Sequence, residues 1–148
     1  MNLDHLKSAW KSIPTSVGVL IVNDIENFTG ITINSFFSVS LDYSILAVSL
    51  SNNSNTMKYI DKTKIFSISI LNTSQRNYAN FFSKKNKLNI PDNLIFNTSK
   101  NGVKSIKDAS VIFYCKLSSS NKVEDHTILY CKIYDVELNH NDPLIWKF

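Results

Sequence analysis

The sequence predicts a mainly β domain with a few short helices, arranged as a closed or split antiparallel barrel. Six or seven strand-like segments occur in the order β-β-β-α-β-α followed by β-β, which differs from the regular alternation of a doubly wound sheet. The chain also lacks a GxGxxG fingerprint for dinucleotide binding. A barrel buries many half-apolar strands without leaving open edges. The length of 148 residues fits one domain spanning residues 1–148.

The first elements follow from apolar spacing. An amphipathic helix is expected over residues 2–12, because apolar residues recur there at intervals of three and four, and Pro14 ends it. Branched aliphatic residues then predict a strand over 17–22, followed by a polar turn over 23–27. Two more strands are expected, joined by a tight connection at 42–44; they cover residues 30–41 and 45–50.

The polar loop 51–56 (SNNSNT) is suited to cap a helix that starts near Thr56. The alternating segment 65–71 predicts a strand with one wet face. Helical spacing returns over 73–83, with Thr73 or Ser74 as the N-cap, and the polar segment 84–107 is expected to be a long loop with short extended pieces. The remaining strands are expected over residues 109–117, 126–138 and 143–148.

Composition excludes several functional classes. The formal net charge is +4, but the basic residues are scattered, and the densest cluster is only Lys84, Lys85 and Lys87. We therefore expect a solvated basic surface and no nucleic-acid partner. Cys115 and Cys131 follow neither a CxxC nor a zinc pattern, so we expect reduced thiols in strands and no metal. No signal peptide or membrane span is evident, which favours a cytoplasmic protein with no membrane contact.

The segment 30–42 (GITINSFFSVSLD) is the most informative. Thr32 and Asn34, then Ser38 and Ser40 after a bend, place hydroxyls and an amide at alternate positions of an extended stretch. With exposed backbone N–H groups, such a stretch can cradle a phosphate or an oxyanion, while the neighbouring Phe pair can back an aromatic ligand. The alternative is a solvated strand face with the Phe pair in the core.

The same segment resembles the signature T-x-N-S-F-x-S-V-S of the flavin reductase family, the FMN-binding split barrels that include the reductase components of two-component monooxygenases. Later landmarks recur in the family's order: FSISILNTSQRNYANFF, then Asp125 and His126, and finally Pro143 and Leu144. Together they span nearly the whole chain. Glu124 stands where the family usually has a glycine before Asp-His, and Tyr43 and Ser44 replace its Pro-Pro.

The resemblance implies a role for each matching residue. Thr32, Asn34 and Ser35 would line the flavin ring and ribityl chain, with Ser38 and Ser40 near the phosphate. The polar loop would help hold the phosphate or ribityl end through Ser49, Ser54 and Thr56. The end of the second main helix would contact the phosphate through Phe82, Ser83 and Lys84, and His126 would bind the nicotinamide.

The implied activity is NAD(P)H-dependent reduction of FMN or FAD, by hydride transfer from NADH or NADPH between stacked rings. The cofactors supply this chemistry and the protein supplies their position, so no residue is assigned as catalytic. The resemblance also implies a homodimer and a partner oxygenase that receives diffusing reduced flavin. Two alternatives stay open: a non-catalytic flavin-binding module in which Glu124 has abolished nicotinamide use, and a small FMN-dependent oxidase of the pyridoxamine-phosphate oxidase type.

Overall fold

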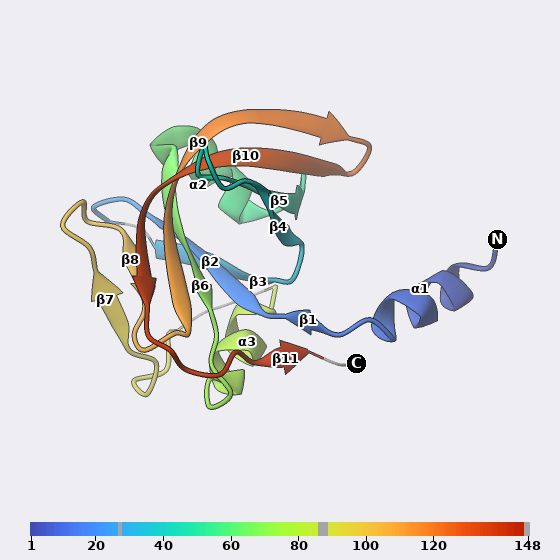
Figure 1. Cartoon of the computed structure of the whole chain (residues 1–148), viewed down its shortest axis with the longest axis horizontal. Coiled ribbons are helices and arrows are strands. Elements are labelled where there is room, and N and C mark those ends of the chain that lie inside the picture. The colour runs from blue at the N-terminus through green and yellow to red at the C-terminus, as the bar shows by residue number, and fades with distance from the viewer. Residues whose placement is uncertain (27, 86–88, 147–148) are drawn as a thin grey trace.

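The computed structural model describes residues 1–26, 28–85 and 89–146, and its main feature is one strongly curved antiparallel sheet (Figure 1). Seven strands follow one another in the order β3-β2-β6-β9-β10-β5-β4, with every pairing antiparallel. The end strands β3 and β4 do not pair with each other, so the sheet is split rather than closed. The predicted mainly β, antiparallel split barrel is therefore confirmed. The strands are β2 (Gly18–Asn23), β3 (Phe28–Ile33), β4 (Phe36–Ser40), β5 (Ile45–Ser51), β6 (Ile65–Ile70), β9 (Val111–Val123) and β10 (His126–Leu138).

Three helices and two small strand pairs complete the described chain. The helix α2 (Asn55–Thr63) packs on β2, β3 and β6, and α3 (Arg76–Phe82) packs on β2 and β3. The helix α1 (Leu3–Lys11) projects away from the body and buries none of its residues (Figure 1). β1 (Thr15–Ser16) pairs with β11 (Ile145–Trp146), and β7 (Phe96–Thr98) pairs with β8 (Lys104–Ile106).

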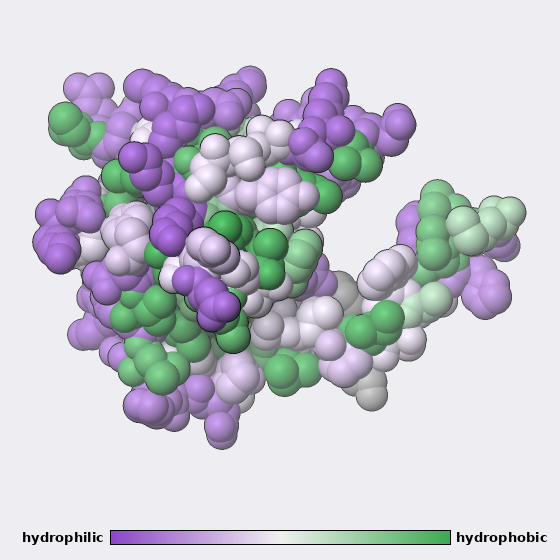
Figure 2. Space-filling view, turned by 45° about the horizontal axis from the view of Figure 1, so that its top comes forward, coloured by the Kyte–Doolittle hydropathy of each residue, from purple (hydrophilic) through white to green (hydrophobic). Residues whose placement is uncertain are grey.

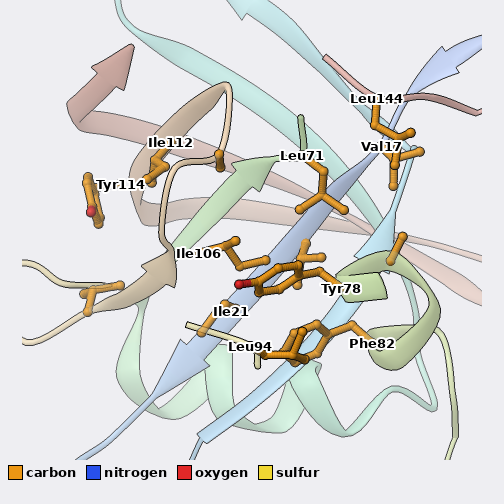
Figure 3. Packing of buried hydrophobic residues seen from close by; sticks show 14 residues of the cluster. Val17, Ile21, Leu71, Tyr78, Phe82, Leu94, Ile106, Ile112, Tyr114 and Leu144 are labelled. Carbon is orange, nitrogen blue, oxygen red and sulfur yellow. The ribbon is translucent and has the colours of Figure 1, made fainter. Parts of the chain in front are cut away.

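The sheet separates two hydrophobic clusters, and β2 contributes to both. Val19 and Ile21 join the cluster that packs against α3, whereas Leu20 and Val22 join the cluster inside the curl of the sheet. All four side chains are fully buried, which explains why this strand is a continuous apolar run. Figure 3 shows the first cluster, in which Tyr78 and Phe82 of α3 reach down to the sheet.

The structure corrects several predicted boundaries. The strand expected over 30–41 is two strands, because the chain bends at residues 34–35 and β4 joins the sheet on the far side. β9 continues beyond residue 117 to Val123, where it forms a long exposed hairpin with β10. Of the predicted turn 23–27 and loop 84–107, residues 27 and 86–88 lie outside the described residues, as do 147–148 of the last strand.

The predicted N-cap of α3 is also wrong. The Asn72 side chain accepts hydrogen bonds from the backbone N–H and the hydroxyl of Ser74, at 2.9 and 2.7 Å. The Gln75 side chain in turn accepts from the Asn72 N–H at 3.0 Å. These bonds use the polar groups of residues 72–75 for a turn, so the helix begins only at Arg76 and Gln75 occupies the cap position without a side-chain cap bond.

The two cysteines are free and fully buried on β9 and β10, as predicted. Burial raises the pKa of Cys131 to about 12 and also raises the pKa of Cys115 well above that of an exposed thiol. Both side chains therefore stay protonated at neutral pH and act as small core residues. The described residues contain no cluster of three or more His, Cys, Asp or Glu residues arranged to hold a metal. None of the described helices has the length and apolarity to cross a membrane.

Gly30 allows α3 to lie directly on β3. A Cβ at this position would lie 2.9 Å from Cδ1 and Cε1 of the Phe82 ring and 3.1 Å from the Leu20 carbonyl oxygen. The Phe82 ring cannot retreat freely, because it is almost fully buried and packs edge-on against Phe28, Phe81 and Phe96. The close approach of helix and strand therefore depends on the absence of a side chain at Gly30.

We expect Gly30→Ala to lower the free energy of unfolding by about 1–3 kcal/mol, the usual effect of overpacking a core. Gly18→Ala is the matched control on the neighbouring strand, because its added Cβ would meet side chains at 3.4 Å, an ordinary contact distance. Urea denaturation, monitored by tryptophan fluorescence, measures the free energy of unfolding of both variants. Equal stabilities for the two variants would show that Phe82 yields to the new methyl group.

Candidate functional site

A cleft of about 750 Å³ opens between β3, the loop before α2 and the end of α3. Its volume lies within the range of about 300–1,000 Å³ that is typical of small-ligand sites. Five of the predicted site residues line it: Ser54, Thr56, Phe82, Ser83 and Lys84. The other ten lining residues lie outside the predicted set: Phe28, Thr29, Gly30, Ile31, Ser51, Asn53, Asn55, Phe81, Lys85 and Ile90.

One wall of the cleft is the start of α2. Ser54 caps this helix, and its hydroxyl accepts a hydrogen bond from the Thr56 N–H at 3.2 Å. Thr56 is almost fully buried, which fixes the first turn against the body. The free N–H groups and the helix dipole of such a nine-residue helix favour an anion at this end, and no acidic residue lies in the first turn.

The opposite wall is the end of α3. Phe82 is buried beneath the cleft, and the Ser83 hydroxyl donates to the Asn80 carbonyl at 2.8 Å, so both side chains mainly hold the helix end in place. Lys84 and Lys85 follow and are exposed, so their ammonium groups are accessible to a ligand. The cleft therefore combines a helix N-terminus with two cations, which suits a phosphate.

The predicted ring-binding residues are not among the residues that line the cleft, and each uses its side chain within the protein. The Thr32 hydroxyl donates to the Ala79 carbonyl of α3 at 2.7 Å. The Asn34 amide donates to the Thr15 hydroxyl at 3.2 Å. The Ser35 hydroxyl donates to the Ser49 carbonyl at 2.7 Å.

A second bond joins Ser35 and Ser49, because the Ser49 N–H donates to the Ser35 carbonyl at 2.9 Å. The bend at residues 34–35 is thereby fixed to β5, and the sequence supplied no sign of this pairing. Ser38 and Ser40 lie on the edge strand β4 and do not line the cleft. The Ser40 hydroxyl accepts from the Tyr43 N–H at 3.3 Å in the following turn.

His126 stands at the start of β10, in register with Ser51 on β5. Its Nδ1 lies 2.9 Å from a carboxylate oxygen of the neighbouring Asp125, and the interaction with His126 lowers the pKa of Asp125. Since a carboxylate can only accept, Nδ1 is the donor in this contact, and Nε2 is the ring nitrogen not used in it. The side chain is about half exposed, so this nitrogen can reach a ligand.

The hairpin that carries His126 is tied to the polar loop through Asn52. The Asn52 N–H donates to the Asp125 carbonyl and its side-chain amide to the Glu124 carbonyl, both at 2.9 Å. The Thr127 hydroxyl donates to the Asn52 side-chain oxygen at 2.6 Å. These three bonds fix the position of His126 relative to the loop that lines the cleft.

Glu124 occupies the first position of the two-residue hairpin turn with a φ of 51°. This left-handed conformation favours glycine and costs a residue with a Cβ about 1 kcal/mol or more. The backbone thus explains in physical terms why a glycine suits this position.

We expect Glu124→Gly to raise the free energy of unfolding by about 1 kcal/mol, because the strain at φ 51° is relieved. Glu124→Ala is the control: it removes the same charge but keeps a Cβ. Urea denaturation compares the three proteins, and an alanine variant as stable as the glycine variant would attribute the gain to the lost charge instead.

Comparison with known proteins gives a matching family model and several similar proteins. The family model described as "Flavin reductase like domain" matches residues 10–148. The NADH-dependent flavin reductase StyB of Pseudomonas fluorescens is 31% identical over 136 residues, covering 89% of this chain and 78% of its own. The FMN reductase (NADH) SmoA of Agrobacterium fabrum is 26% identical, over 99% of this chain and 83% of its own. The solved styrene monooxygenase flavin reductase of Pseudomonas putida superposes with a TM-score of 0.87 at 28% identity, over 96% of this chain and 91% of that one.

Proposed function

The chain belongs to the flavin reductase-like family, and on this premise we propose that it is an NADH-dependent flavin reductase that supplies reduced flavin to a partner monooxygenase. The observation that carries the proposal is the cleft lined by Ser54, Thr56 and Lys84. The enzyme is taken to act as one domain over residues 1–148, and in the cytoplasm, where NADH is supplied.

The residues present fit a flavin. The cleft offers hydroxyls and ammonium groups for a phosphate, and apolar surface from Phe28 and Ile31 nearby. We assign Lys84 and the start of α2 to the phosphate and the fixed bend at Asn34 and Ser35 to the ribityl and ring end. Ser49 holds that bend through its two bonds to Ser35, and Thr32 ties the preceding strand to α3. Ser38 and Ser40 stay predicted contacts on the edge strand.

When bound, the flavin accepts a hydride from the reduced nicotinamide, and the chain contributes position and charge. His126 is proposed to orient the nicotinamide: its Nε2, which the Asp125 contact does not use, can hydrogen-bond the carboxamide group. The Asn52 bonds would keep the imidazole at a fixed distance from the cleft. Such positioning lowers the barrier by holding the donor and acceptor in a reactive geometry.

We expect the purified protein to oxidise NADH in the presence of FMN, and Lys84→Gln to weaken FMN binding about three- to tenfold through the loss of one charge-assisted phosphate contact. Riboflavin, which lacks the phosphate, should bind both proteins alike. Lys107→Gln is the control, because Lys107 is exposed and the hydrogen bonds assigned to it are made by its backbone. The measurements are NADH absorbance and flavin fluorescence titration.

Three outcomes would contradict these expectations. Equal losses for FMN and riboflavin would remove Lys84 from the phosphate site. Bound flavin without NADH oxidation would indicate a flavin-binding module instead of a reductase. Neither binding nor turnover would reject the proposed function.

We also propose that the protein acts as a homodimer. The projecting α1 exposes Leu3 and Trp10, at 61% and 68%, although its spacing is amphipathic. The edge strand β4 exposes Phe37 at 58%. Figure 2 shows hydrophobic residues on the projecting arm and on the body across the hollow between them. A second copy seated on these surfaces would cover them.

Sedimentation should therefore give the mass of a dimer. Trp10→Glu should shift the monomer–dimer equilibrium toward the monomer, because it would place a charge in an apolar contact. Ser8→Glu is the control: Ser8 lies two residues earlier, on the other side of the same helix. A wild-type monomer with full activity would refute the dimer.

A further inference from the structure

The cleft does not end at the phosphate site. A second hollow of about 560 Å³ adjoins it and shares three of its lining residues, Phe28, Thr29 and Asn55. The remaining lining consists of Lys58, Tyr59 and Lys62 on the next turns of α2. The two hollows are therefore adjacent; together we call them the channel, which follows the outer end of β3 and the exposed side of α2.

The order of groups along this channel is fixed by the two elements that form it. The path from the first cleft to the second hollow leads along β3 from Ile31 toward Phe28. On α2 the same path leads from Asn55 toward Lys62. A ligand whose phosphate lies at Ser54 and Lys84 thus reaches the second hollow only with atoms beyond that phosphate. FMN has none, whereas FAD carries a second phosphate and an adenosine there.

The chemistry of the second hollow suits those groups. Lys58 and Lys62 are exposed cations, and the Lys62 ammonium lies 3.2 Å from the Asp24 carboxylate, so the three groups sum to one positive charge. Tyr59 and Phe28 are half-buried aromatic residues. Two ammonium groups beside aromatic surface can bind a phosphate followed by a purine, which stacks on aromatic side chains.

We propose that this second hollow, lined by Lys58, Tyr59 and Lys62, is the subsite for the adenylate half of FAD, and that FAD is the preferred flavin. The proposal rests on the proposed flavin reductase function and specifies its substrate. Lys58 is the residue whose contribution is most separable, because Lys62 also contacts Asp24.

The test is fluorescence titration of the full chain with FMN and with FAD. The wild-type protein should bind FAD more tightly, and Lys58→Glu should weaken FAD binding about tenfold, since an attraction becomes a repulsion, with FMN binding changed less than about twofold. A glutamate near the start of α2 is also compatible with the helix dipole, so the variant should fold. Lys107→Glu is the control for the change in net charge.

Equal weakening of both flavins by Lys58→Glu would place this lysine at the shared phosphate and overturn the proposal. No effect on either flavin, or an equal effect of Lys107→Glu, would place the adenylate elsewhere and also overturn it. Failure of the proposed function looks different, because then neither flavin binds the wild-type protein.

Discussion

The contact between Phe82 and the bare backbone of Gly30 is the constraint on which the cleft depends. It brings the end of α3 onto β3. Two residues farther along β3, the hydrogen bond from Thr32 to the Ala79 carbonyl also holds the two elements together. Because α3 is only seven residues long, its end is positioned by this contact and not by the stiffness of a long helix. The location of Lys84, two residues farther on, follows from it.

The other wall of the cleft is positioned independently. Asn52 ties the loop before α2 to the turn that carries Asp125, and the start of α2 is then fixed by the Ser54 cap and the burial of Thr56. One side of the site thus belongs to the β5–β10 half of the sheet and the other to the β2–β3 half. The split in the sheet leaves room for a ligand between these halves, which a closed barrel would fill with side chains.

Local patterns were sufficient to predict most elements, because β2, β5 and β10 are rich in apolar, strand-forming residues. They failed at two places, one decided by a partner distant in sequence and the other by competing local side-chain hydrogen bonds. The bend at residues 34–35 is stabilised by Ser49, and the start of α3 is delayed by the Asn72 and Gln75 side chains. For the site, the predicted residues of 54–56 and 82–84 line the cleft, but the contribution of Phe28 and Thr29 arises only from the folding of β3 over α2.

Three polar side chains of the signature segment are hydrogen-bonded within the protein rather than held free for a ligand. Thr32, Asn34 and Ser35 each donate to a partner elsewhere in the chain. Their first effect is therefore to fix the backbone at the bend, which would spare a ligand bound there the cost of reorganising it. Hydride transfer between two stacked rings needs this kind of rigidity more than it needs an acid or a base. A site without a catalytic acid–base pair accordingly suits this chemistry, and in the proposals made above the charges of Lys84 and Lys58 bind the anionic part of the substrate.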